Sequence, residues 1–163
     1  MKEIKDALSR GADRVGGWSN HFRRTKRWEE RAVHALTNLP ATEFNTALDY
    51  ALAYFIWSHS LREWLIGDGI FLKDELDLAL RRYPEWRIVR DLANRSKHLI
   101  LTQNPTDGDW VVFREYDHFA PQVEGRERHH LNLYFDGKKY LLLDVISSTR
   151  SMWEKILSDK GLI

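Results

Sequence analysis

The stretch from Thr42 to Ile66 constrains the fold more than any other part of this sequence. When it is placed on a helix at about 100° per residue, apolar side chains cover most of the circumference: Phe44, Leu48, Ala51, Tyr54, Phe55, Trp57, Leu61, Trp64 and Leu65. A helix that is apolar nearly all round needs other elements to cover it on most sides. We therefore expect this helix to lie at the centre of a helical bundle.

Further segments carry the same helical periodicity, and turn residues separate them. Ser19 or Asn20 is expected to cap the helix before the central one, because their side-chain oxygens accept hydrogen bonds from free backbone amides. Gly67 ends the central helix, and Pro84 separates the next two. The expected helices are a short one at Lys2–Ser9 and longer ones at 19–39, 70–83, 86–100 and 144–157.

Beyond Pro105 the hydrophobic period changes from that of a helix to that of a strand. Residues 110–119 are rich in β-branched and aromatic side chains, and residues 129–135 alternate strictly between apolar and polar. The pair Asp136-Gly137 predicts a tight hairpin turn. The chain then returns as a third strand over residues 139–143, so the pattern predicts a small antiparallel meander.

These elements predict a mainly α fold, a helical bundle with a small antiparallel β-meander near the C-terminus. The length of 163 residues suits one domain with a hydrophobic core. We therefore expect a single domain over residues 1–163. The sheet at about 110–143 is interpreted as an insertion in the bundle, or an appendage to it.

Composition excludes several classes of function. The chain has no Cys, which excludes disulfide scaffolds and thiolate metal sites. It has no HExxH motif and no glycine-rich phosphate loop, so we expect neither a metal nor a cofactor. The first residues have no apolar core, and no apolar run reaches the roughly 18 residues of a membrane span. We expect a cytoplasmic protein without membrane contact. The net charge of only +1 means that nucleic acid must be bound by a local patch.

The helix expected over Trp86–Ile100 has one polar half. A row of side chains runs along it at steps of four, three and four, so that neighbours in the row can touch: Arg87, Asp91, Asn94 and His98, with Arg90 and Lys97 beside it. One interpretation is a solvated charged face. The other is a site that faces phosphate or RNA.

Polar residues on the central helix are few, and they are therefore informative. His59 and Glu63 are four residues apart, within reach of a hydrogen bond on a helix. In one interpretation His59 is buried and is satisfied by Glu63 or by a backbone carbonyl. In the other, His59, Arg62 or Glu63 lines the same site as the polar half of 86–100.

The densest basic run lies on the helix before the central one. It consists of Arg23, Arg24, Lys26 and Arg27. Such a run is commonly a solvated surface, but long basic side chains of this kind also make phosphate contacts. Both interpretations stay open at this point.

The sequence RDLANRSKH, with WSHSLREWL upstream, resembles the HEPN superfamily, and more narrowly a group of small bacterial HEPN-like proteins. The resemblance covers about residues 40–100. In active HEPN ribonucleases the motif is an Arg, four to six residues of which the first is polar, and a His. Here Asp91 follows Arg90, and seven residues separate Arg90 from His98.

The resemblance implies a metal-independent endoribonuclease of toxin or defence type. In that reaction His98 would transfer the proton, Arg90 would hold the phosphate, and Asp91 or Asn94 would orient His98. Four side chains are expected around them as binding residues: Lys97, Arg87, His59 and Glu63. The resemblance also implies a homodimer. The alternative is a non-catalytic HEPN-like module that binds RNA or a protein partner such as an antitoxin. In a third interpretation the polar face is structural and function lies elsewhere.

Overall fold

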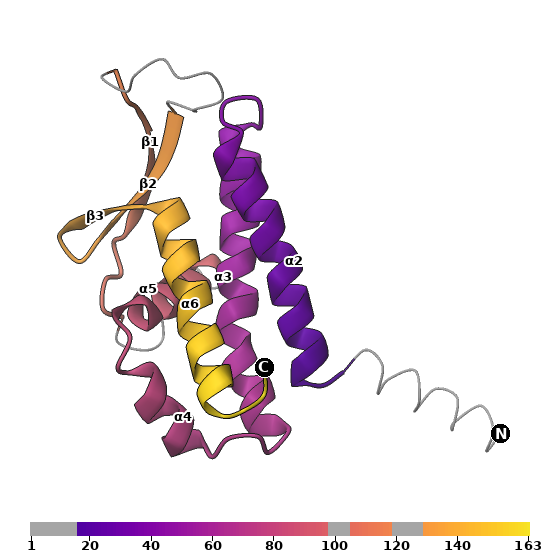
Figure 1. Ribbon diagram of the computed structural model, residues 1–163. Coiled ribbons are helices and arrows are strands. Elements are labelled where there is room, and N and C mark those ends of the chain that lie inside the picture. Colours follow the sequence, from indigo (N-terminus) through magenta and orange to yellow (C-terminus); the bar gives the residue numbers. More distant parts are fainter. Residues whose placement is uncertain (1–15, 98–104, 119–128) are drawn as a thin grey trace, which may run out of the picture.

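A computed structural model describes residues 16–97, 105–118 and 129–163. The fold is mainly helical with one small antiparallel sheet, as the sequence predicts (Figure 1). The described elements are α2 (Trp18–Thr37), α3 (Phe44–Gly67), α4 (Lys73–Leu80), α5 (Pro84–Lys97), β1 (Val111–Tyr116), β2 (His129–Phe135), β3 (Lys138–Leu141) and α6 (Leu142–Asp159). The helix expected at Lys2–Ser9 lies outside the described residues, as do the last three residues of the helix expected to end at Ile100. No helix in the described ranges is long and apolar enough to cross a membrane.

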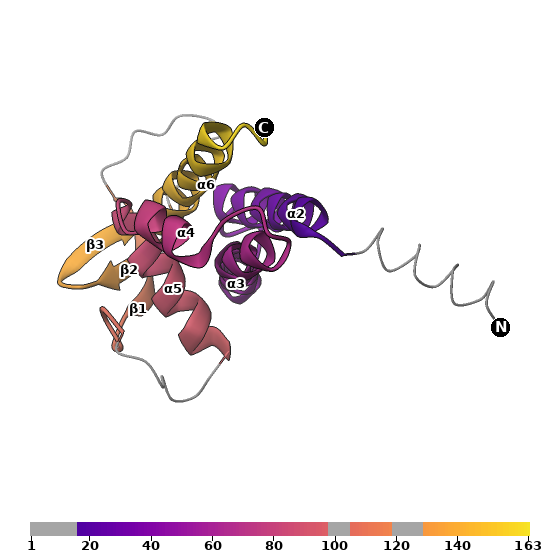
Figure 2. The same cartoon turned by 90° about the horizontal axis from the view of Figure 1, so that it is seen from below.

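Helix α3 is the central element of the bundle. It packs against α2 on one side and against α5 on another, and α6 also contacts it (Figure 2). Tyr54, Phe55 and Leu61 are fully buried at these contacts. However, Trp57 and Trp64 are only partly buried, so one strip of α3 is not covered by the described elements.

A buried hydrogen bond fastens α6 to α3. The indole Nε1 of Trp153 donates to Ser58 Oγ at 2.8 Å, and both side chains are withdrawn from solvent. The Trp153 ring also meets Trp86 of α5 edge to face, with ring centres 5.9 Å apart. Three helices are therefore joined around one indole.

A second polar contact joins α2 to α3. The imidazole of His21 is 2 % exposed. Its Nε2 lies 2.8 Å from the carbonyl oxygen of Trp57 and 3.0 Å from Ser60 Oγ. The ring also stacks on Trp64, with centres 5.5 Å apart. His21 therefore has a structural role, and its partners come from α3.

The sheet belongs to the core of the protein. Its strands follow one another in the order β1-β2-β3, all antiparallel. Asp136 and Gly137 both have positive φ, 47° and 74°, which confirms the tight turn between β2 and β3. Leu131, Leu133 and Phe135 point to one face of β2 and join the same buried cluster as the helices. The sheet therefore shares the hydrophobic core of the helices.

Two local expectations are corrected. Neither Ser19 nor Asn20 caps α2, because the helix begins at Trp18 with Gly17 before it and without a side-chain cap. Helix α4 is also shorter than the expected 70–83. The backbone amides of Ile70 and Phe71 both donate to the carbonyl of Leu65, so this part of the chain belongs to the turn that ends α3.

We expect Ser58→Ala to lower the free energy of unfolding by about 1–3 kcal/mol, because the buried indole N–H of Trp153 would lose its acceptor. Urea denaturation measures this change. Ser151→Ala on the exposed side of α6 is the matched control and should change stability by about 0.5 kcal/mol or less. Equal losses in the two variants would contradict a structural role for the buried bond.

Candidate functional site

Asp91 is buried, although the helical spacing places it on the polar half of α5. Its side chain is 1 % exposed. One carboxylate oxygen accepts a hydrogen bond from Arg90 Nε at 2.9 Å. The other accepts from the backbone amides of Thr106 and Asp107, at 2.6 and 2.9 Å. Asp91 thus anchors the chain segment that leads to the sheet, and both of its oxygens are engaged there.

Two arginines of α5 support the same segment. Arg90 Nη2 donates to Thr106 Oγ1 at 2.9 Å. Arg95 Nη1 donates to the carbonyls of Gly108 and Trp110, at 2.6 and 3.2 Å, and its guanidinium lies over the Trp110 ring. Part of the polar half of α5 therefore contacts the neighbouring chain segment, while Arg87, Arg95 and Lys97 stay exposed.

Arg87 and Asn94 of the polar row do not share the contacts of Asp91. Arg87 reaches toward Asp136 in the β2–β3 turn, with 3.7 Å between Nη1 and Oδ2. Asn94 is partly buried and makes no side-chain hydrogen bond with another described residue. His98 lies outside the described residues, so the expected approach of Arg90 and His98 stays a prediction.

Asp91→Ala is expected to lower the free energy of unfolding by about 3 kcal/mol, because it leaves Arg90 and two backbone amides without their buried acceptor. Chemical denaturation followed by circular dichroism measures the loss. Asn94→Ala, one turn further along α5, is the control and should cost about 0.5 kcal/mol. A loss of that small size in Asp91→Ala would show that the anchor is dispensable.

A group of cationic side chains lies where α3 meets α5. His59 of α3 stacks on Trp86 of α5, with ring centres 5.3 Å apart and 12° between the planes. Burial, together with the smaller effects of the charges of Lys97, Arg62 and Arg90, lowers the pKa of His59 to about 4. These four polar side chains, His59, Arg62, Arg90 and Lys97, form what we call the α3–α5 cationic cluster.

The imidazole at the centre of this cluster is not fully satisfied. Its Nδ1 is buried and has no hydrogen-bond partner among the described residues. Glu63 is exposed and does not bond to His59, so the expected pairing of these two residues is wrong. The reason is that the imidazole is turned toward Trp86, a partner that the sequence placed only in the core. The charges of Lys97 and Arg90 on α5 act on His59, and a site shared by His59 and the polar half of α5 stays a prediction.

The three cations of the cluster differ in how much of their charge is already offset. Arg62 donates through Nε and Nη2 to both oxygens of Asp77 on α4, at 2.5 and 2.8 Å, which lowers the pKa of Asp77. Arg90 pairs with Asp91. Lys97 is exposed and forms no ion pair within the described part of the chain.

This arrangement suits an oxyanion. An uncharged imidazole offers one N–H donor, and the ammonium and guanidinium groups offer charged donors that bind phosphate oxygens strongly. Burial is the main cause of the lowered pKa of His59, and an anion placed among these groups would offset the smaller effect of the neighbouring positive charges. The sequence named each polar member of the cluster but missed Trp86 as the ring that holds His59 in place.

Comparisons with known proteins add no family or fold assignment. No family model, no curated protein and no solved structure matches this chain.

Proposed function

We propose that this protein binds RNA, and that its α3–α5 cationic cluster takes a phosphate group of the RNA backbone. The main support is the grouping of Arg62, Arg90 and Lys97 around one uncharged, largely buried imidazole. Lys97 has no carboxylate partner among the described residues, so its charge is available to a ligand. The HEPN resemblance of residues 40–100 points to the same class of ligand.

The net charge of the chain supports a local site over a general attraction to nucleic acid. With a net charge of +1, the protein has no strong overall positive potential that would attract RNA to its whole surface. Affinity must then come from a few contacts between basic side chains and phosphates, and each of them releases bound counterions and makes binding sensitive to salt.

A metal-independent endoribonuclease of toxin or defence type is the second candidate function. Cleavage of this kind needs a base for the 2′-hydroxyl, an acid for the leaving oxygen and a cation for the phosphate. His98 follows Lys97 directly in the sequence, and His59 shares its surroundings with Lys97. Because both oxygens of Asp91 are engaged, Asn94 is the better candidate for orienting His98.

Assembly and protein partners belong to the same proposal. The HEPN resemblance implies a homodimer, which would bring two clusters into one particle. In the non-catalytic alternative, a protein partner such as an antitoxin would occupy the site. Sedimentation of the purified chain, alone and with RNA, distinguishes a dimer from a monomer.

We expect the His59 imidazole to titrate with a pKa of about 4 in the free protein. Saturation with a short oligonucleotide should raise this pKa, because the added phosphates offset the nearby positive charges. Lys97→Gln should raise it too, whereas Lys73→Gln on α4 should leave it unchanged. NMR of the histidine ring protons measures each value. A His59 pKa that is unaffected by saturating RNA would place the ligand elsewhere.

The same histidine makes folding stability depend on pH. The unfolded chain takes up this proton near pH 6.5, while the folded chain takes it up near pH 4. The unfolded state thus holds more protons between these values, and the stabilisation present above pH 6.5 is lost as the pH falls toward 4. His59→Gln should reduce this slope in denaturation experiments at several pH values.

RNA binding and cleavage can be separated in one series in EDTA. Lys97→Gln should weaken RNA binding and reduce the slope of log affinity against log salt by about 0.7. If the wild type cleaves RNA, the product should carry a 2′,3′-cyclic phosphate, and His98→Ala should lose at least about 10²-fold in rate. Binding without cleavage would favour the non-catalytic module. Wild-type rates in His98→Ala would exclude the proposed catalytic site.

As a test of the cleavage reaction, Arg90→Ala is harder to interpret than the sequence alone suggests. Its place on the polar half of the helix predicts no effect on stability. However, the structure ties Arg90 to the buried Asp91, so the variant should also melt at a lower temperature. A loss of rate in this variant has to be compared with its loss of stability.

A further inference from the structure

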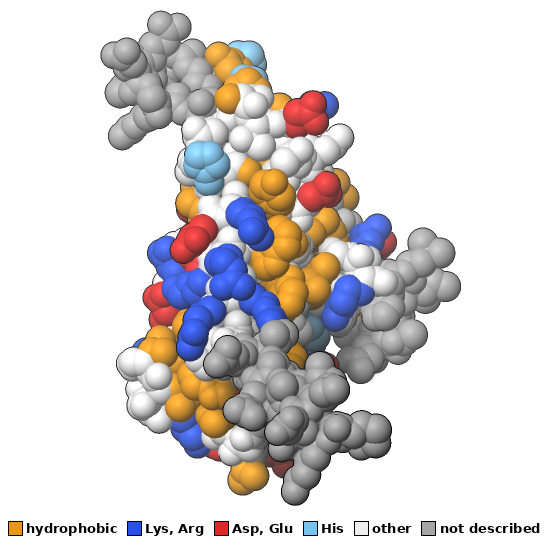
Figure 3. Space-filling model, turned by 90° about the vertical axis from the view of Figure 1, so that its right-hand side faces the viewer, with side chains coloured by type: hydrophobic (Ala, Val, Ile, Leu, Met, Phe, Trp, Pro, Cys, Tyr) orange, Lys and Arg blue, Asp and Glu red, His pale blue; other side chains and the backbone are white. Residues whose placement is uncertain are grey.

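Helix α2 presents a row of arginines to solvent. Arg23, Arg27 and Arg31 are all exposed and follow one another at four-residue steps, so they share one face of the helix. Figure 3 shows Lys and Arg side chains gathered on this side of the molecule beside a strip of apolar side chains.

Within the described ranges, no carboxylate forms an ion pair with these arginines. None of the ion pairs between described residues involves Arg23, Arg27 or Arg31. Lys26 on the same helix differs, since it pairs with Glu154 of α6 at 2.5 Å. Like charges at four-residue steps destabilise a helix slightly, so this row has a cost to the fold that an external anion would remove.

Aromatic rings lie directly beside the arginine row. Arg31 lies over the Trp28 ring, 4.7 Å from its centre, and Trp28 meets Tyr50 of α3 at 6.1 Å. Arg24 lies 5.9 Å from the centre of the Trp57 ring. All three rings are only partly buried. We call Arg23, Arg27, Arg31, Trp28, Tyr50 and Trp57 the arginine–aromatic face.

We propose that the arginine–aromatic face binds a single-stranded nucleic acid. Its guanidinium groups would contact phosphates, and its rings would stack on unpaired bases. This combination favours a single strand over a duplex, because a duplex keeps its bases stacked within the helix. It also favours a nucleic acid over an acidic polypeptide, because carboxylates would use the arginines and leave the rings without a matching partner. The two helices that form this face also carry exposed carboxylates, Glu30 on α2 and Asp49 on α3.

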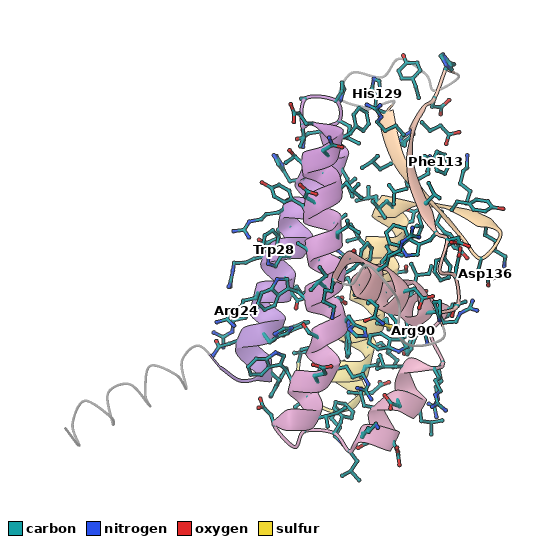
Figure 4. All side chains as sticks on the ribbon, turned by 180° about the vertical axis from the view of Figure 1, so that it is seen from behind. Arg24, Trp28, Arg90, Phe113, His129 and Asp136 are labelled. Atoms are coloured by element: carbon teal, nitrogen blue, oxygen red, sulfur yellow. The ribbon has the colours of Figure 1, made fainter. Side chains whose placement is uncertain are left out.

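The arginine–aromatic face is separate from the α3–α5 cationic cluster. Helix α3 lies between α2 and α5, and Figure 4 shows Trp28 and Arg90 on different sides of it. A dinucleotide would therefore occupy only one of the two surfaces. A longer strand would reach from one to the other across α3, so the two surfaces can be tested apart.

The test is the affinity of the full chain for a labelled oligouridine of about 15 nucleotides, measured by fluorescence polarisation. The variant Arg27→Gln/Arg31→Gln should weaken binding about tenfold and lower the salt slope by about 1.4, the loss expected for two phosphate contacts. The control Lys73→Gln/Arg82→Gln removes the same amount of charge from exposed positions around α4 and should bind as the wild type does. Quenching of tryptophan fluorescence by the oligouridine should accompany binding.

Several outcomes would overturn this inference. Wild-type affinity in Arg27→Gln/Arg31→Gln would do so, as would equal affinity for a duplex of the same length, or tight binding of polyglutamate without binding of oligouridine. Lys97→Gln separates this inference from the proposed function. If Lys97→Gln weakens binding and the arginine variant does not, the cluster proposal stands and this one fails. The reverse result supports this face and removes the cluster.

Discussion

The hydrogen bonds to the buried carboxylate of Asp91 fasten α5 to the chain segment just before β1. A charge removed from water is tolerated only when donors surround it, and here one guanidinium and two backbone amides do so. The amides belong to the segment just before β1. The carboxylate thus fixes where the chain leaves the helices and enters the sheet, and it fixes Arg90 at the same time. The position of the α3–α5 cationic cluster depends on this anchor.

The parts of the fold that follow from the periodicity of the hydrophobic residues were predictable. The apolar circumference of 42–66 predicted a central helix, and the alternation of 129–135 predicted β2 with its bounds. The Asp136-Gly137 pair predicted the turn because few other residues accept positive φ at both positions. These signals are local, and each is carried by residues adjacent in the sequence.

The features that the sequence could not predict depend on contacts between segments that are far apart in the sequence. A helical projection assigns Asp91 to the polar half, but it cannot show that Thr106 and Asp107 cover that half. It pairs His59 with Glu63 by spacing, but it cannot show that Trp86 of another helix attracts the imidazole. The candidate site was therefore predictable in its residue types, and only partly in which of them meet. Lys26 shows the same limit, because its partner Glu154 is far away in sequence.

The stacked rings at the cluster have a consequence for the entropy of binding. His59 lies on Trp86, and Trp86 meets Trp153, so rings from α3, α5 and α6 are packed in series. Arg62 and Arg90 are held by Asp77 and Asp91. An anion arriving there would find most of its donors already immobilised, and preorganisation of this kind reduces the conformational entropy lost on association. Lys97, exposed on the last described turn of α5, is the member whose side chain still has to be ordered.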